Sequence, residues 1–194
     1  MNKKNIAVFA SGAGSNAQKI IDHFRRHAFI SVALIVCNKP GAGVTKIAAT
    51  EGIELLLTDK ATLQSPDFSS VLKGKGIDFI ILAGFLLKIP ASLVEAFPRR
   101  IINIHPALLP KYGGKGMYGH FVHEAVINAK EAESGITIHY VDEQYDHGAT
   151  IFQATCAVTP ADTPDSLAHK IHLLEHQHFA PVIERLVADE ASGS

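Results

Sequence analysis

The first half of the chain alternates short apolar segments with amphipathic ones. Apolar, strand-like segments occur at residues 6–10, 31–37, 54–57, 79–83 and 101–104. Segments with apolar residues at helical spacing lie between them, at residues 15–26, 44–51, 68–73 and 92–97. Because strands that alternate with helices in this way pair in parallel, the pattern predicts a doubly wound sheet with helices on both faces.

The second half has a different pattern. It predicts a helix and then two strands, at residues 122–129, 135–141 and 150–158. The short connection between these two strands predicts an antiparallel pair, and therefore a mixed sheet. The last helix is predicted to begin after Thr163, which is suited to cap it, with Pro164 at its first position, and to end near Ala188.

Together these elements predict a single α/β domain with a Rossmann-like, doubly wound, mostly parallel but mixed sheet. The domain is expected to span residues 1–190, and residues 191–194 are expected to form a disordered tail. Hydrophobic residues make up 47% of the 194 residues, which is enough to fill a sizeable core.

Charge and cysteine content narrow the functional classes. The formal net charge is −1, so no basic surface is predicted for nucleic acid or for an anionic membrane. No apolar run reaches the ~18 residues of a membrane span, and no signal peptide precedes the first strand. Cys37 and Cys156 lie in apolar segments and are predicted to be buried free thiols. These features predict a cytoplasmic protein.

A glycine-rich turn joins the first predicted strand to the first helix, at residues 11–17. Exposed N–H groups at such a helix start favour an anion such as phosphate. Gly12, Gly14 and Ala17 also fit the dinucleotide pattern, so an NAD-binding protein is an alternative. That pattern needs an acid after the second strand, where this chain has Asn38, so a monophosphate site is favoured. A tight turn without a ligand is the structural alternative.

Asn103 and His105 interrupt an apolar strand near its carboxyl end. Because residues two apart on a strand point the same way, both side chains face one side, at the edge where α/β sheets bind ligands. An amide and an imidazole there are suited to donate hydrogen bonds to a developing oxyanion. Asp146, on a later loop, is a candidate to pair with His105 and raise its pKa, although the residues alone favour a solvated acid in a turn. The alternatives are structural polar residues and a solvated turn acid.

Four histidines lie in the last predicted helix, and His172 and His176 have the spacing of some metal ligands. On a helical projection, however, His169, His172 and His176 lie opposite the apolar face. We therefore expect solvated histidines and no metal site.

Four segments of the chain carry a resemblance to a known family: residues 10–16, 82–85, 103–112 and 142–148. In their order and spacing they resemble the folate-dependent formyltransferases, and the Gly-Ser-Asn turn resembles the phosphoribosylglycinamide branch of that family. The resemblance covers about residues 5–188.

The resemblance implies roles for individual residues. The implied catalytic trio is Asn103, His105 and Asp146. The implied site for the ribonucleotide substrate consists of Gly12, Ala13, Gly14, Ser15 and Asn16 around the phosphate and Glu175 at the ribose hydroxyls. The implied folate site consists of Phe85, Leu86, Leu87, Ile89, Asn103, Tyr140, Val141 and Asp142.

Two segments depart from the family pattern. Relatives commonly carry Met-Arg where this chain has Leu86-Leu87, so any side-chain role of that arginine is lost. After Tyr112 the family usually has a short proline-glycine turn and a histidine pair. This chain instead has the longer, glycine-rich segment 113–120, in which His120 is the candidate replacement for one histidine.

The resemblance implies formyl transfer from 10-formyl-tetrahydrofolate to the amine of glycinamide ribonucleotide, a step of purine synthesis, without a metal or a covalent intermediate. It assigns phosphate binding to about residues 1–100 and folate binding and catalysis to about residues 101–190. A formyltransferase for another amine, a formyl-tetrahydrofolate hydrolase and an NAD-binding protein remain as alternatives. A homodimer is compatible with the sequence.

Overall fold

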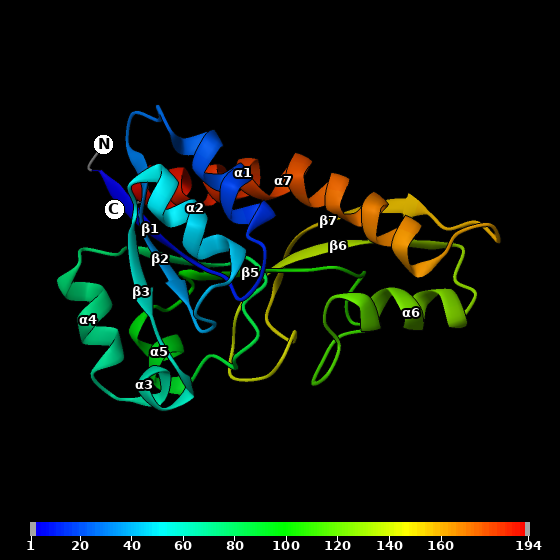
Figure 1. The fold of residues 1–194 in the computed structure, drawn as a ribbon, viewed down its shortest axis with the longest axis horizontal. Helices are drawn as coiled ribbons and strands as arrows, with labels where there is room; N and C mark the ends of the chain where they lie inside the picture. Colours follow the sequence, from blue (N-terminus) through cyan, green and yellow to red (C-terminus); the bar gives the residue numbers. More distant parts are fainter. Residues whose placement is uncertain (1–2, 193–194) are drawn as a thin grey trace.

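A seven-stranded sheet runs through the middle of the molecule, with helices on both faces (Figure 1). The computed structural model describes residues 3–192. In chain order the strands are β1 (Lys4–Phe9), β2 (Ile30–Cys37), β3 (Glu54–Leu57), β4 (Phe79–Leu82), β5 (Ile101–His105), β6 (Glu133–Tyr140) and β7 (Thr150–Ala157). Their order across the sheet is β3-β2-β1-β4-β5-β6-β7. The first five are parallel to one another, β6 is antiparallel to β5 and β7 is antiparallel to β6, which confirms the predicted mixed, mostly parallel α/β fold.

The helices are α1 (Ser15–Phe24), α2 (Gly43–Glu51), α3 (Lys60–Gln64), α4 (Phe68–Gly74), α5 (Ala91–Ala96), α6 (His120–Asn128) and α7 (Pro164–Ser192). The sequence pattern missed α3, a short helix whose first turn is capped by Asp59, which accepts a hydrogen bond from the Thr62 N–H at 2.7 Å. Thr163 caps α7 as predicted, because its hydroxyl accepts from the Ser166 N–H at 3.2 Å.

Helix α7 is longer than predicted. It continues to Ser192, so two residues of the predicted disordered tail are helical, and residues 193–194 lie outside the described residues. Within residues 3–192, no helix has both the length and the apolar character that a membrane crossing needs. Both cysteines are free; Cys37 is buried, as predicted, whereas Cys156 is only half-buried.

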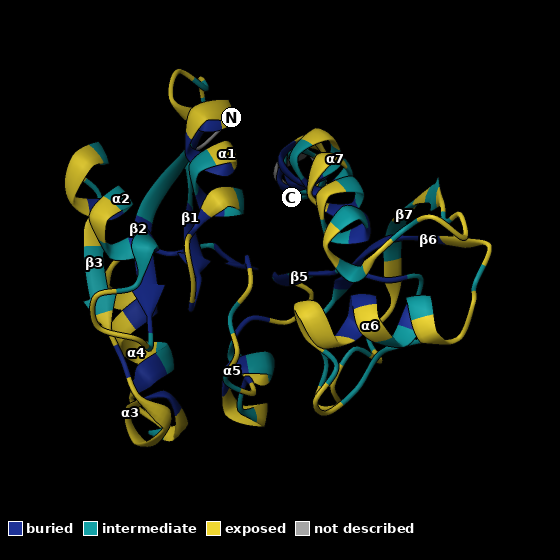
Figure 2. Cartoon of the chain, turned by 45° about the vertical axis from the view of Figure 1, so that its right-hand side comes forward, coloured by how far each residue is buried: buried dark blue, intermediate teal, exposed yellow. Residues whose placement is uncertain are grey.

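Each face of the sheet has its own hydrophobic core, because alternate residues of a strand point to opposite faces. Figure 2 shows the central strands in the colour of buried residues. Ile6 and Val8 of β1 pack with α1, α2 and α7, whereas Ala7 and Phe9 of the same strand pack with α3, α4 and α5. Burial of both faces explains why β4 is wholly apolar. Helix α6 packs against α7 beside the antiparallel strands.

Four polar residues interrupt this apolar pattern on one face of β5 and β6. In the antiparallel register Asn103 lies opposite His139, and His105 lies opposite Thr137. Their neighbours Ile102, Ile104, Ile136 and Ile138 point to the other face, into the core beneath α7. The two strands therefore place four polar side chains together on the face that carries α3, α4 and α5.

Gly148 allows the loop that carries Asp146 to lie against the end of β6. A Cβ atom at position 148 would lie 1.9 Å from the carbonyl oxygen of Tyr140, which is far inside contact distance. The Tyr140 N–H donates to the Ala149 carbonyl at 3.0 Å, so the loop backbone cannot move away without losing a hydrogen bond.

We expect Gly148→Ala to lower the free energy of unfolding by about 1–3 kcal/mol, as overpacking in a tight site does. Gly74→Ala is the matched control, because a Cβ at that helix end meets nothing within 4 Å and should change stability by no more than about 1 kcal/mol. Urea unfolding of both variants measures the difference. Equal stability of the two variants would show that the loop adjusts freely.

Candidate active site

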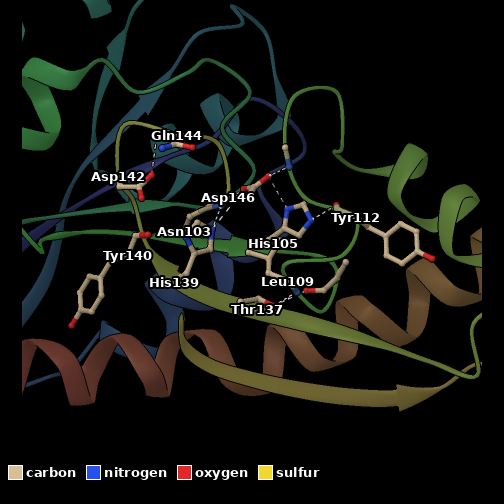
Figure 3. Close-up of polar contacts among 12 residues, drawn as sticks. Asn103, His105, Leu109, Tyr112, Thr137, His139, Tyr140, Asp142, Gln144 and Asp146 are labelled. Carbon is tan, nitrogen blue, oxygen red and sulfur yellow. Dashed lines mark hydrogen bonds and ion pairs between the residues drawn. The ribbon is translucent and has the colours of Figure 1, made fainter. Parts of the chain in front are cut away.

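Asp146 lies within reach of the other two residues of the predicted trio (Figure 3). Its Oδ2 is 3.6 Å from Nδ1 of His105, and its Oδ1 is 3.5 Å from Nδ2 of Asn103. The Gly114 N–H donates to Oδ2 at 2.9 Å, which ties the glycine-rich segment after Tyr112 to the same carboxylate. Residues from β5, the β6–β7 loop and segment 113–119 thus meet at one point.

His105 is buried, with 3% of its surface exposed, and both ring nitrogens face acceptors. Nε2 lies 2.8 Å from the carbonyl oxygen of Tyr112, which accepts only, so Nε2 carries a hydrogen. Burial lowers the pKa of His105, while the charge of Asp146 and the Tyr112 carbonyl raise it. Burial prevails and the pKa lies below its ordinary value, while Asp146 acts in the predicted direction and raises the pKa.

Asp146 remains ionised despite its partial burial. Burial raises the pKa of this carboxyl, but the imidazoles of His139 and His105 and the Gly114 N–H together lower it by more. The site therefore combines an anionic carboxylate, an imidazole of low basicity and an amide, which are groups suited to moving a proton and stabilising an oxyanion.

A cavity opens beside this cluster. It is lined by Leu82, Phe85, Leu87, Lys88, Ile89, Asn103, His139, Val141, Asp142, Gln144, Tyr145 and Asp146. Six of the eight predicted folate-site residues are in this set. Leu86 is not; its side chain is 41% exposed and its N–H donates to the Ser11 hydroxyl at 2.9 Å. Tyr140 is not in the set either. The Cζ atom of Arg99 lies 4.7 Å from the centre of the Tyr140 ring, and Tyr140 lines a second cavity at the opposite ends of the strands.

Sequence reasoning missed several residues of the cavity, His139 above all. Strand β6 has polar residues two apart, Thr137 and His139, just as β5 has Asn103 and His105. The same alternation of polar and apolar residues would have identified His139. Lys88 was also missed. Its Nζ lies 5.6 Å from the centre of the Tyr145 ring and provides a cation at the cavity.

The glycine-rich turn forms the N-terminal end of α1. Gly14 has a φ of 86°, and a Cβ there would lie 2.9 Å from Val44, so the turn packs directly against α2. The Ser11 hydroxyl donates to Oδ1 of Asn38 at 2.5 Å, so Asn38 holds the turn rather than replacing a ribose-binding acid. This contact weakens the NAD-binding alternative.

Glu175 of α7 meets Asn16 at the start of α1. The Asn16 amide donates to Oε2 of Glu175 at 2.9 Å, and Oδ1 of Asn16 is buried without a hydrogen-bond partner among residues 3–192. Glu175 is 7% exposed, and burial raises its pKa although the Asn16 hydrogen bond lowers it. The predicted phosphate turn and the predicted ribose-binding acid are therefore neighbours.

The histidines of α7 do not form a metal-binding cluster among the described residues. The rings of His172 and His176 stack with centres 6.2 Å apart, and in the described part of the chain no cluster of three metal-ligating side chains occurs. His169 and His172 are exposed as predicted. His176 is half-buried and its Nε2 is buried without a partner among the described residues, so the prediction of a solvated side chain was wrong there.

The family of the chain follows from comparison with known proteins. Residues 4–183 match the family described as formyl transferase, and the chain belongs to this family. Its relatives include the phosphoribosylglycinamide formyltransferase of Bacillus subtilis (strain 168), which is 35% identical over 95% of both chains.

Two further matches agree. The chloroplastic phosphoribosylglycinamide formyltransferase of Arabidopsis thaliana is 43% identical over 93% of this chain, which spans only 64% of that relative's length. The solved structure of glycinamide ribonucleotide transformylase 1 from Geobacillus kaustophilus superposes with a TM-score of 0.85 at 37% identity, over 95% of this chain and 99% of that chain.

The pairing of His105 with Asp146 has a direct test. In the parent protein, NMR titration should give His105 a pKa below 6.5, and Asp146→Asn should lower it further because the neighbouring negative charge is removed. An unchanged His105 pKa in the variant would show that the carboxylate and the ring are not coupled.

Proposed function

We propose that the protein transfers the formyl group of 10-formyl-tetrahydrofolate to the amine of 5-phosphoribosylglycinamide, which gives formylglycinamide ribonucleotide and tetrahydrofolate, a step of purine (IMP) biosynthesis. The observation that carries the proposal is the meeting of Asn103, His105 and Asp146 beside an open cavity in a member of the formyl transferase family. The names of the most similar relatives support the choice of substrate.

The two substrates are assigned to two neighbouring regions. The phosphate of the ribonucleotide is assigned to the turn of Gly12, Ala13, Gly14, Ser15 and Asn16. This turn leads into the ten-residue helix α1, whose first backbone N–H groups favour an anion. Its ribose hydroxyls are assigned to the buried carboxyl of Glu175. The reduced folate is assigned to the cavity between Phe85–Ile89 and Val141–Asp146.

The reaction follows from the chemistry of the three catalytic residues. The neutral amine attacks the formyl carbon, forming a carbon–nitrogen bond and a tetrahedral oxyanion. Asn103 donates a hydrogen bond to that oxygen, and the growing negative charge raises the proton affinity of His105 beside it. The bond from carbon to N10 of the folate then breaks. The ionised Asp146 accepts a proton from the amine, directly or through water, and N10 receives one.

The Nε2–H of His105 is bound to the Tyr112 carbonyl, and His105 is not among the residues that line the cavity. A substrate oxygen must therefore compete with that carbonyl for the imidazole. Asn103 is already at the cavity wall and is the donor that a substrate meets first.

Other features of the proposal concern location and partners. Both substrates are small molecules, and the function requires neither nucleic acid nor a membrane. Two free thiols suit a reducing compartment, so we place the reaction in the cytoplasm. All residues assigned to the reaction come from one chain, so a second copy is not required for the site, and a homodimer is compatible with it.

The decisive experiment is an absorbance assay of deformylated folate with and without glycinamide ribonucleotide. Product that forms only with the ribonucleotide supports transfer to this acceptor. Product without any acceptor would indicate a hydrolase, and product with a different amine would indicate another formyltransferase. A thermal shift with NAD, together with no turnover, would favour the dinucleotide alternative.

Asn103→Ala should lower kcat roughly 10²–10³-fold, the usual cost of one oxyanion donor. The KM for each substrate should change little, because the hydrogen bond is strongest in the transition state. Steady-state kinetics of the purified variant measure both. Near-normal turnover would remove Asn103 from the mechanism.

Glu175→Gln should raise the KM for the ribonucleotide about tenfold, which corresponds to about 1.4 kcal/mol of lost binding to the ribose hydroxyls. The KM for the folate should stay the same, since the cavity is lined by other residues. Glu184→Gln, on the same helix but paired with His23 and His27, is the control and should change neither constant. A rise in the folate KM alone would reassign Glu175.

A further inference from the structure

His139 lies directly across the sheet from Asn103 and touches it. The two residues are partners in the β5–β6 register, and Nε2 of His139 is 3.0 Å from Nδ2 of Asn103. His139 is 1% exposed, so water does not compete for either ring nitrogen from most directions. Figure 3 shows His139, Asn103 and Asp146 pointing toward one another.

The other ring nitrogen of His139 fixes its tautomer. Nδ1 lies 2.8 Å from the carbonyl oxygen of Tyr140, which only accepts hydrogen bonds, so Nδ1 carries a hydrogen. A neutral ring with Nδ1–H has a lone pair on Nε2, and that lone pair faces the Asn103 amide. Oδ1 of Asp146 is 3.7 Å from Nε2, beyond hydrogen-bond distance, so the amide is the nearest partner.

We propose that His139 is a positioning residue that holds the Asn103 amide with its nitrogen, not its oxygen, toward the reacting formyl oxygen. The inference rests on the proposed formyl transfer. It adds a residue that acts through Asn103 and donates no hydrogen bond to the substrate itself. It explains how the amide is kept from rotating by half a turn, which would present an oxygen to the oxyanion.

The geometry explains why the nitrogen of the Asn103 amide, and not its oxygen, is held in this position. An amide nitrogen has two hydrogens, and both acceptors near Asn103, Nε2 of His139 and Oδ1 of Asp146, favour the nitrogen on their side. His139 takes one hydrogen at 3.0 Å. The contact with Asp146 is long, at 3.5 Å, so the second hydrogen remains available to a substrate oxygen. The rotated amide would instead place its oxygen against a lone pair and a carboxylate.

The chain also holds the Tyr140 carbonyl in place. Tyr140 ends β6, and its N–H donates to Ala149, whose neighbour Gly148 lies against the same carbonyl. The acceptor that sets the His139 tautomer is therefore part of the sheet and not of a free loop. The chain of contacts runs from the Tyr140 carbonyl through His139 to Asn103 and the cavity.

Two matched substitutions separate the hydrogen bond from the space that the ring fills. His139→Gln keeps an acceptor near the position of Nε2, whereas His139→Met has similar length without a strong acceptor. We expect His139→Met to lower kcat roughly 10²-fold, close to the loss of one oxyanion donor, with both KM values little changed. His139→Gln should recover most of this loss. Equal losses in both variants, or losses seen mainly in KM, would overturn the proposal.

A double-variant cycle distinguishes positioning from support of the fold. If His139 acts through Asn103, His139→Met should cost no further activity in the Asn103→Ala protein, measured by single-turnover kinetics. A purely structural role would produce the same further loss in both backgrounds, and that result would contradict the proposal. Urea unfolding of each variant identifies proteins that fail to fold.

An NMR experiment on the parent protein tests the His139–Asn103 hydrogen bond without an activity assay. The ¹⁵N shifts of His139 should show a protonated Nδ1 and an unprotonated Nε2 at neutral pH, with a coupling across the hydrogen bond to Nδ2 of Asn103. An imidazolium, or a hydrogen on Nε2, would overturn the proposal even if formyl transfer is found. If instead the tautomer is as expected but the parent transfers no formyl group, the proposed function fails and the contact stands.

Discussion

The antiparallel pairing of β5 with β6 is the constraint on which the site depends. It places Asn103 opposite His139 and His105 opposite Thr137, so that polar groups from two strands share one face of a sheet that is otherwise apolar. Thr137 donates to the Ala107 carbonyl at 2.7 Å and accepts from the Leu109 N–H at 3.0 Å, which fixes the chain just after the site. A shift of β6 by one residue would turn Thr137 and His139 into the core beneath α7, away from Asn103 and His105.

Burial decides the charges in this cluster. The loss of water lowers the basicity of His105, while two imidazoles and a backbone N–H keep Asp146 anionic. The site therefore carries a negative charge and a nearly neutral ring before substrate binds. Such an arrangement favours proton movement only when a new negative charge forms nearby, which connects proton transfer to the chemical step rather than to binding.

Much of the fold and part of the site could be predicted from the sequence, since alternation is a local property. The apolar strands, the mixed sheet and the shared direction of Asn103 and His105 all follow from residue spacing. Contacts that depend on the path of a loop or on the approach of distant segments did not follow. Examples are the Tyr112 carbonyl that binds His105 and the Tyr140 ring that turns away from the folate cavity. The short helix α3 was missed because five residues carry too little periodicity.

The contact of Asn16 with Glu175 joins residues that are 159 positions apart in the chain. The cavity to which we assign the folate, by contrast, is built entirely from residues between Leu82 and Asp146. As the chain is synthesised from its amino end, the residues of the cavity are complete before those of the acceptor site, which must wait for α7. A chain that stops before Pro164 has every residue of the donor pocket and lacks the acid assigned to the ribose. Because Ile171, Phe179 and Ile183 of α7 are buried in the core on one face of the sheet, such a chain would also lack the packing that supports the pocket.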